Sequence, residues 1–191
     1  FLAVSVLNRT FPQGLEKVDT PQRQKLRAAY EEWREAVDQD DELLPDLHRE
    51  WIRLVLAELL EFDHESLVQA SDWTGEIPSV SSQEHFGRFQ PNWFVRYPVD
   101  HTTRLCAAVL PPHTDVDSVQ RNDSWPVSRQ ERMTLLCRDH KVRLGLLTNG
   151  ERWMLVNAPN GSISSQASWY SRLWFQEPIT LKAFQSLLGV R

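Results

Sequence analysis

The sequence of 191 residues contains only two cysteines, and none of its apolar runs approaches the length that spans a membrane. A transmembrane helix needs about 20 consecutive apolar residues, so no membrane partner is expected. The start FLAVSVLNRTF also lacks the basic residues and the small-residue cleavage site of a secretory signal. So few cysteines argue against a small secreted domain held together by disulfides. We therefore predict a cytoplasmic protein in which Cys106 and Cys137 are buried free thiols rather than a disulfide.

An excess of positive charge is missing as well, because 26 acidic residues outnumber 21 lysines and arginines and give a net charge of −5. This balance argues against a generally basic coat for nucleic acid, but it leaves room for a local basic patch. The chain also lacks GxxxxGK[ST], GxGxxG, CxxC, HExxH and GxSxG. Each motif supplies groups that its chemistry needs, so their absence argues against nucleotide hydrolysis, dinucleotide binding, zinc chemistry and α/β-hydrolase chemistry.

Aromatic residues are plentiful, with eight tryptophans among 41% hydrophobic residues, so the chain can bury a sizeable core. In the first third, apolar residues at helical spacing predict a helix over 20–38, with Thr20 as its N-cap, and a second helix over 45–62. The acidic run 38–42 between them is typical of a solvated loop rather than of a metal site. Residues 63–90 are mixed and polar, which predicts a long loop.

From residue 91 onward the pattern changes to strands. Residues 92–97 are rich in strand-forming residues. Residues 104–110 are apolar throughout, which is typical of a central strand covered on both faces. The further predicted elements are a helix at 128–139, two strands joined at Asn149-Gly150, a strand at 169–175 and a helix at 180–188.

The strongest local signals lie within residues 128–156. Ser128 and Glu131 have the spacing of a capping box, in which the serine oxygen accepts from a free helix amide and the glutamate reaches back. Asn149-Gly150 stands between two apolar runs and predicts a hairpin with a two-residue type I′ turn, which needs positive φ at both central residues.

This order of elements predicts an α/β (α+β) fold, in which a helical N-terminal segment precedes a mixed sheet with flanking helices. The strand–helix–strand pattern over 104–149 is typical of a parallel crossover. We assign 1–70 to the helical segment, 71–90 to a loop or linker, and 91–191 to the sheet-containing domain. Since the chain starts at Phe1 and stops without a tail, we expect it to be a fragment of a longer polypeptide.

Few residues suggest metal binding or acid–base chemistry. His113, Asp115 and Asp117 alternate, so an extended segment would place three metal-ligand side chains on one side. The favoured alternative is a polar loop in which the aspartates cap turns. His140 falls at the end of the predicted helix, and we interpret it as a structural histidine rather than a catalytic one. The sequence therefore predicts neither a metal site nor a catalytic residue.

Positive charges are concentrated around the helix and hairpin of 128–156. If several of them share one face, they can hold phosphates and give a salt-dependent, sequence-independent affinity for nucleic acid. The alternative is that they are solvated and pair with neighbouring acidic side chains. The predicted nucleic-acid-binding residues are Arg129, Arg132, Lys141, Arg143 and Arg152, with Arg138 in the same stretch. The tryptophans are interpreted as core packing rather than as base-stacking platforms.

Two strings carry a family resemblance: RLCAAVLPPHTDVD at 104–117 and SRQERMTLLCRDHKVRLGLLTNGERWMLV at 128–156. Together they resemble the N-terminal region of large bacterial DNA methyltransferases and restriction–modification polypeptides. These include type IIG restriction enzymes and the methyltransferases of BREX and DISARM phage-defence systems. GLLTNGERW is the most specific element, although a hairpin of this wording also occurs in type I restriction subunits. The resemblance covers residues 91–156 well and the earlier helices more loosely.

In many relatives this region is a PD-(D/E)xK nuclease, in which an aspartate after proline and a Glu-x-Lys strand hold Mg²⁺ and activate water. Here Asn92 follows Pro91, and Ala107-Ala108-Val109 stands where Glu-x-Lys is expected. Because Mg²⁺ needs hard anionic oxygens, the resemblance implies a restriction-endonuclease-like scaffold with degenerate positions Asn92, Ala107 and Val109 and no metal. The Asn/Asp-Pro-Pro-Tyr/Phe loop of the methyltransferases is also missing, so a methyltransferase domain would lie beyond Arg191.

The leading hypothesis is a non-catalytic domain that positions double-stranded DNA, or another subunit of a defence complex, for an adenine DNA methyltransferase. The resemblance implies S-adenosylmethionine as cofactor of the parent chain and no cofactor in this segment. The second hypothesis is an active Mg²⁺-dependent nuclease that uses displaced carboxylates of Asp100, Asp115, Asp117 or Glu131. The third is a protein–protein interaction module without DNA contact.

Overall fold

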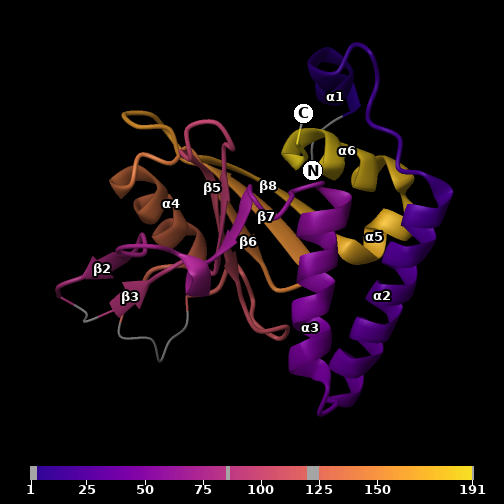
Figure 1. Ribbon diagram of the computed structural model, residues 1–191, viewed down its shortest axis with the longest axis horizontal. Helices are drawn as coiled ribbons and strands as arrows, with labels where there is room; N and C mark the ends of the chain where they lie inside the picture. Colours follow the sequence, from indigo (N-terminus) through magenta and orange to yellow (C-terminus); the bar gives the residue numbers. More distant parts are fainter. Residues whose placement is uncertain (1–3, 85–86, 120–124, 191) are drawn as a thin grey trace. The chain divides into compact units, whose positions relative to one another are not determined.

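The computed structural model describes residues 4–84, 87–119 and 125–190 (Figure 1). Within these residues, α-helices are combined with a mixed six-stranded sheet, so the expected α+β class is confirmed. None of the helices in this described part combines the length and the apolar character needed to cross a membrane.

The chain forms two compact units. The helical unit comprises Phe1–Phe62 together with Trp169–Arg191, and the sheet unit comprises Asp63–Ser168. Both ends of the sequence therefore belong to one unit, and the middle forms the other. The sequence-based assignment of 1–70 and 91–191 draws the boundaries elsewhere, and as a statement about separate domains it stays a prediction.

The helical unit is built from long amphipathic helices near the start of the chain and short helices near its end. Its elements are α1 (Val4–Thr10), α2 (Thr20–Gln39), α3 (Leu44–Arg53), the π-helix η1 (Leu54–Leu59), α5 (Ser171–Gln176) and α6 (Pro178–Leu188). The N-cap of α2 is Asp19 rather than the predicted Thr20, because the Asp19 Oδ1 accepts from the Gln22 amide at 2.7 Å. Thr20 instead begins the helix.

Aromatic rings make the core of the helical unit. The ring centroids of Trp33 and Trp51 lie 6.3 Å apart, those of Trp51 and Trp174 lie 6.1 Å apart, and those of Trp174 and Phe184 lie 4.9 Å apart. All four side chains are at most 1% exposed. These tryptophans are therefore core residues, as the sequence predicted, and they join helices from both ends of the chain.

The sheet unit contains a mixed sheet of strand order β1-β4-β5-β6-β7-β8 and a separate two-stranded sheet, β2-β3. β5 pairs with β4 antiparallel and with β6 parallel, and β6 pairs with β7 antiparallel. The parallel pairing confirms the predicted crossover through α4. The bounds are β1 (Leu67–Gln69), β2 (Val80–Ser82), β3 (Gly87–Phe89), β4 (Trp93–Arg96), β5 (Thr103–Val109), α4 (Arg129–Asp139), β6 (Leu144–Thr148), β7 (Arg152–Asn157) and β8 (Ser165–Tyr170).

Two predicted elements are wrong. The long loop expected at 63–90 contains β1, the short 3₁₀ helix η2 (Ala70–Asp72), β2 and β3. The three strands have only three residues each, which is too short for a period-two pattern to be visible in the sequence. The strand expected at 169–175 begins earlier, at Ser165, and gives way to α5 at Ser171. Burial of Trp174 in the helical core outweighs the strand preference of the local aromatic residues.

The Asn149-Gly150 hairpin is confirmed, but its turn type is not the predicted one. Gly150 has a φ of 88°, whereas Asn149 is not among the described residues with positive φ. The Asn149 Oδ1 accepts from the amides of Glu151 at 3.1 Å and Arg152 at 2.8 Å, which closes a longer turn. The Asn149 side chain therefore reverses the chain direction through its hydrogen bonds, without the left-handed backbone that a type I′ turn needs at this residue.

One face of the sheet packs against α4. The capping box predicted for Ser128 and Glu131 is confirmed in both directions, and it fixes where this helix begins. Both cysteines lie in the resulting core: Cys106 is on β5, Cys137 is on α4, and both are buried free thiols. Burial raises the pKa of both thiols, that of Cys137 to about 12. The prediction of buried free thiols is thus confirmed.

Candidate functional site

The pairing of β4 with β5 brings the three degenerate nuclease positions together. The Asn92 amide donates to the Ala107 carbonyl at 2.9 Å, and the Val109 amide donates to the Asn92 Oδ1 at 2.7 Å. Ala107 and Val109 are two residues apart on β5 and therefore lie on the same face of the sheet. The Asn92 side chain thus extends the pairing of β5 at its carboxyl end.

Apolar burial characterises the rest of this position. Ala107 is 1% exposed, and its neighbours on β5 from Leu105 to Ala108 are at most 3% exposed. An unpaired carboxylate is costly in such surroundings, because burial strongly disfavours its charged form. Asn92, Ala107 and Val109 thus form a packed strand end whose polar side-chain group is the Asn92 amide, and none of the three side chains can act as an acid or a base.

The carboxylates of the nuclease alternative have other partners. Asp100 lies in the turn between β4 and β5, where its Oδ1 accepts from the amide and the hydroxyl of Thr102, and these hydrogen bonds hold the Asp100 pKa below its usual value. Glu131 is used in the capping box of α4. Within the described ranges, no three or more His, Cys, Asp or Glu side chains are grouped so that they could hold a metal ion.

The alternating segment after β5 is a turn-rich loop. The Asp115 Oδ1 accepts from the Asp117 amide at 3.0 Å, so this aspartate caps a turn, as the favoured interpretation expected. Asp117 forms an ion pair with Arg152, and Val116 between the two aspartates is 2% exposed. His113 is exposed. The alternating polar residues of this segment therefore flank the buried Val116 and stabilise a turn.

The five predicted DNA-contacting residues are distributed over opposite ends of the helix and strands that carry them. Arg129 begins α4, whereas Lys141 and Arg143 follow its last residue, and a helix of 11 residues is about 16 Å long. Arg152 begins β7 beside the Asn149 turn, while Arg143 precedes β6 at the opposite end of the same two strands. The structure brings together only Lys141 and Arg143.

Arg132 and Arg152 are both used inside the protein. Arg132 is 3% exposed, and its guanidinium donates to the carbonyls of Val127, at 3.1 Å, and Trp125, while it stacks over the Trp125 ring at 4.8 Å from the centroid. Arg152 pairs with Asp117, and its Nε and Nη2 donate to the Ser168 hydroxyl at 3.2 and 3.1 Å. Their guanidinium groups hold loops in place rather than covering a surface.

Three cations remain at one end of the sheet unit, and we call Arg138, Lys141 and Arg143 the basic end. Lys141, Arg143 and Asn160 line one shallow surface depression, and Arg138 lines a second, still more open one with residues 161–164. The β7–β8 loop forms the other wall of both depressions, and Figure 1 shows it beside α4. Arg138 near the end of α4 and the two cations that follow this helix thus lie close to the β7–β8 loop.

Hydrogen bonds position two of these cations. The Arg138 Nη2 donates to the Ser162 carbonyl at 2.8 Å, and the Arg143 Nε donates to the Asn157 Oδ1 at 3.0 Å. Both contacts are to neutral groups, so the positive charges are not cancelled there. Lys141 is exposed, with a left-handed φ of 56° that turns the chain out of α4. The sequence already indicated this stretch, but the contribution of Arg138 and of the loop depends on non-local packing.

His140 ends α4 next to the basic end. Its Nε2 lies 3.1 Å from the Ser79 nitrogen and 3.0 Å from the Ser79 oxygen, and 3.7 Å from the Asp139 carboxylate. The contact with Ser79 ties the end of α4 to the segment before β2. His140 is therefore a structural helix-end histidine, as the sequence predicted.

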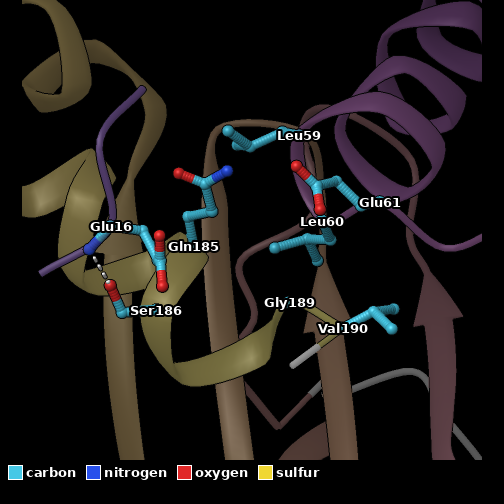
Figure 2. A pocket seen from close by; sticks show the side chains of 8 residues that line it. All are labelled: Glu16, Leu59, Leu60, Glu61, Gln185, Ser186, Gly189 and Val190. Carbon is cyan, nitrogen blue, oxygen red and sulfur yellow. Dashed lines mark hydrogen bonds between the residues drawn. The ribbon is translucent and has the colours of Figure 1, made fainter. Parts of the chain in front are cut away.

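A small cavity of the helical unit lies next to α6 (Figure 2). Its volume is about 20 Å³, which is room for about one water molecule and not for a cofactor. Gln185 lines it, is 6% exposed, and has a side-chain oxygen without a hydrogen-bond partner. Glu16 and Ser186 lie on the same wall, where the Glu16 amide donates to the Ser186 hydroxyl at 2.9 Å. The small size of this cavity is the reason why we do not choose it as the candidate site.

Comparison of the chain with models of protein families, with curated proteins and with solved structures gives no match. The basic end, with its two depressions, is therefore the best candidate for a functional site on the evidence of geometry and charge. The resemblance to restriction–modification proteins stays a prediction from the residues alone.

Proposed function

We propose that the chain is a non-catalytic DNA-positioning domain of an adenine DNA methyltransferase from a restriction–modification or phage-defence system. The observation that carries the proposal is the basic end, where Arg138, Lys141 and Arg143 line two shallow surface depressions. Cations on such a surface attract DNA phosphates and release the counterions of the duplex, which gives affinity without sequence specificity. The double-stranded DNA would be held by its backbone.

The strand arrangement supports a restriction-endonuclease-like scaffold as part of this proposal. An antiparallel β4–β5 pair leads through α4 to a parallel β6, and a backbone hydrogen bond joins the Asn92 amide to the Ala107 carbonyl. With an amide and two apolar side chains at the positions where such nucleases hold Mg²⁺, the scaffold would bind DNA without cutting it. S-adenosylmethionine would bind in a methyltransferase domain elsewhere in the parent protein.

The salt dependence of DNA affinity tests the basic end. Lys141 and Arg143 are both replaced by alanine, and the control is the Arg27→Ala/Arg34→Ala pair, which removes the same charge from exposed positions of α2. Each lost phosphate contact lowers the slope of log K against log salt by about 0.9, so we expect the first pair to lower it by about 2 and the control to leave it unchanged. Equal slopes for all three proteins would refute the proposal.

A protein–protein module is the second candidate function, because Val99 at the tip of the β4–β5 turn is 95% exposed. An apolar side chain presented in this way can anchor a partner subunit. Absence of DNA binding even at low salt favours this candidate. A plasmid-nicking assay with Mg²⁺ or Mn²⁺ tests the remaining nuclease hypothesis. If the chain cuts DNA and the Asp115→Ala/Asp117→Ala variant does not, the nuclease hypothesis would replace both the DNA-positioning and the protein–protein candidates.

A further inference from the structure

One apolar side chain stands out in the polar loop of the basic end. Ile163 is 91% exposed, although its neighbours in the β7–β8 loop are serine, glycine and asparagine. It lines the same depression as Arg138. Single exposed apolar residues are common on proteins, so the exposure of Ile163 becomes informative only through the loop that carries it and the charges around it.

The loop that presents Ile163 is tied at several points. Arg138 donates to the Ser162 carbonyl next to Ile163 at 2.8 Å, which fastens the tip of the loop to the end of α4. At its base, the Asn157 Nδ2 donates to the Ser165 hydroxyl at 3.3 Å. Gly161 turns the chain with a φ of 70°, in the left-handed region that favours glycine. Ile163 is therefore held outward by a braced loop.

We propose that Ile163 is an apolar wedge that enters a base step of duplex DNA while the basic end holds the flanking phosphates. This inference rests on the proposed function. DNA-bending proteins combine cations and amides with an inserted Leu, Ile, Met or Phe, which partly unstacks one step and kinks the duplex. The basic end has this composition, since Ile163 lines one depression with Arg138 and two serines, while Lys141, Arg143 and Asn160 line the other. Charge complementarity selects DNA over an apolar protein surface as the occupant.

The test measures unstacking and bending separately from binding. A duplex of about 20 base pairs carries 2-aminopurine at successive steps and a donor–acceptor dye pair at its ends. The wild-type chain should raise 2-aminopurine fluorescence at one or a few steps and shorten the end-to-end distance. Ile163→Ala should abolish both signals and weaken binding about tenfold, while the salt slope stays unchanged. Ile163→Phe should retain both signals, because it keeps a large apolar side chain.

Leu43→Ala serves as the control, because it shortens another exposed apolar side chain that lies outside the basic end. It should leave fluorescence and dye distance at wild-type values. If Ile163→Ala still unstacks and bends DNA, the wedge is refuted, while the proposed function stands as long as Lys141→Ala/Arg143→Ala lowers the salt slope. If the wild-type chain binds no DNA at low salt, both the wedge and the proposed function are refuted.

Discussion

Replacement of Arg132 by methionine should destabilise the protein without acting on DNA directly. Methionine keeps a similar length but cannot donate, so the Val127 and Trp125 carbonyls lose their partner, and the stacking on Trp125 is lost. Hydrogen bonds from a charged group contribute about 1.5–3 kcal/mol each, and an arginine–tryptophan contact adds about 0.5–1 kcal/mol. Removal of a desolvated charge offsets part of this. We expect the free energy of unfolding to fall by about 3–5 kcal/mol.

Urea denaturation followed by tryptophan fluorescence measures this change, and Arg143→Met is the matched control. Arg143 is exposed and its Nε donates only to the neutral Asn157 Oδ1, so its loss should cost less than about 1 kcal/mol but weaken DNA binding. Arg132→Met should therefore lower mainly the free energy of unfolding, whereas Arg143→Met should lower mainly the affinity for DNA. The reasoning is refuted if Arg132→Met leaves the denaturation midpoint unchanged and weakens DNA binding as Arg143→Met does, since Arg132 would then be a surface contact.

Four further outcomes are expected. Gly145→Ala should lower the free energy of unfolding by about 1–3 kcal/mol in a thermal unfolding assay, because the added Cβ would overlap the Met133 side chain, and the double variant with Met133→Ala should lose less than the sum of the two single losses. Gln185→Met should leave stability unchanged or raise it by about 1 kcal/mol in the same assay, since it removes a buried oxygen without a partner. Cys137, with its pKa raised to about 12, should resist thiol reagents near neutral pH until the protein unfolds. Hydrogen bonds lower the Asp63 pKa, so its stabilising effect is complete above the usual carboxyl pKa and lost as pH falls through the lowered value; Asp63→Asn should therefore be less stable than wild type at neutral pH but not in strong acid.

Local signals in the sequence predicted local structure well. The capping box at Ser128 and Glu131 sets the start of α4 because both partners lie within one helical turn. The position of the Asn149-Gly150 hairpin was predictable for the same reason. Its turn type was not, because the choice depends on which amides the Asn149 side chain reaches in the folded chain.

Non-local packing decided what the sequence did not predict. Arg132 precedes Leu136 by four residues and so lies on the buried face of α4, a spacing that could have marked it as an interior residue. The strand expected at Trp169–Phe175 became a helix where Trp174 packs against Trp51, which is more than 100 residues away in the chain. The candidate site also depends on non-local packing, because Arg138 contacts the β7–β8 loop only in the folded chain.

The helical unit combines an early and a late segment of the chain, and this affects how it folds during synthesis on the ribosome. α2 and α3 emerge early, but α5 and α6 follow only after the whole sheet unit. At about 5–20 residues per second, Trp51 must wait roughly 5–25 s for Trp174 to be made. The sheet unit can fold first, while the apolar faces of α2 and α3 stay uncovered and open to chaperones. Nascent chains stalled before residue 171 should therefore protect the sheet unit from proteolysis and leave α2 and α3 open to cleavage.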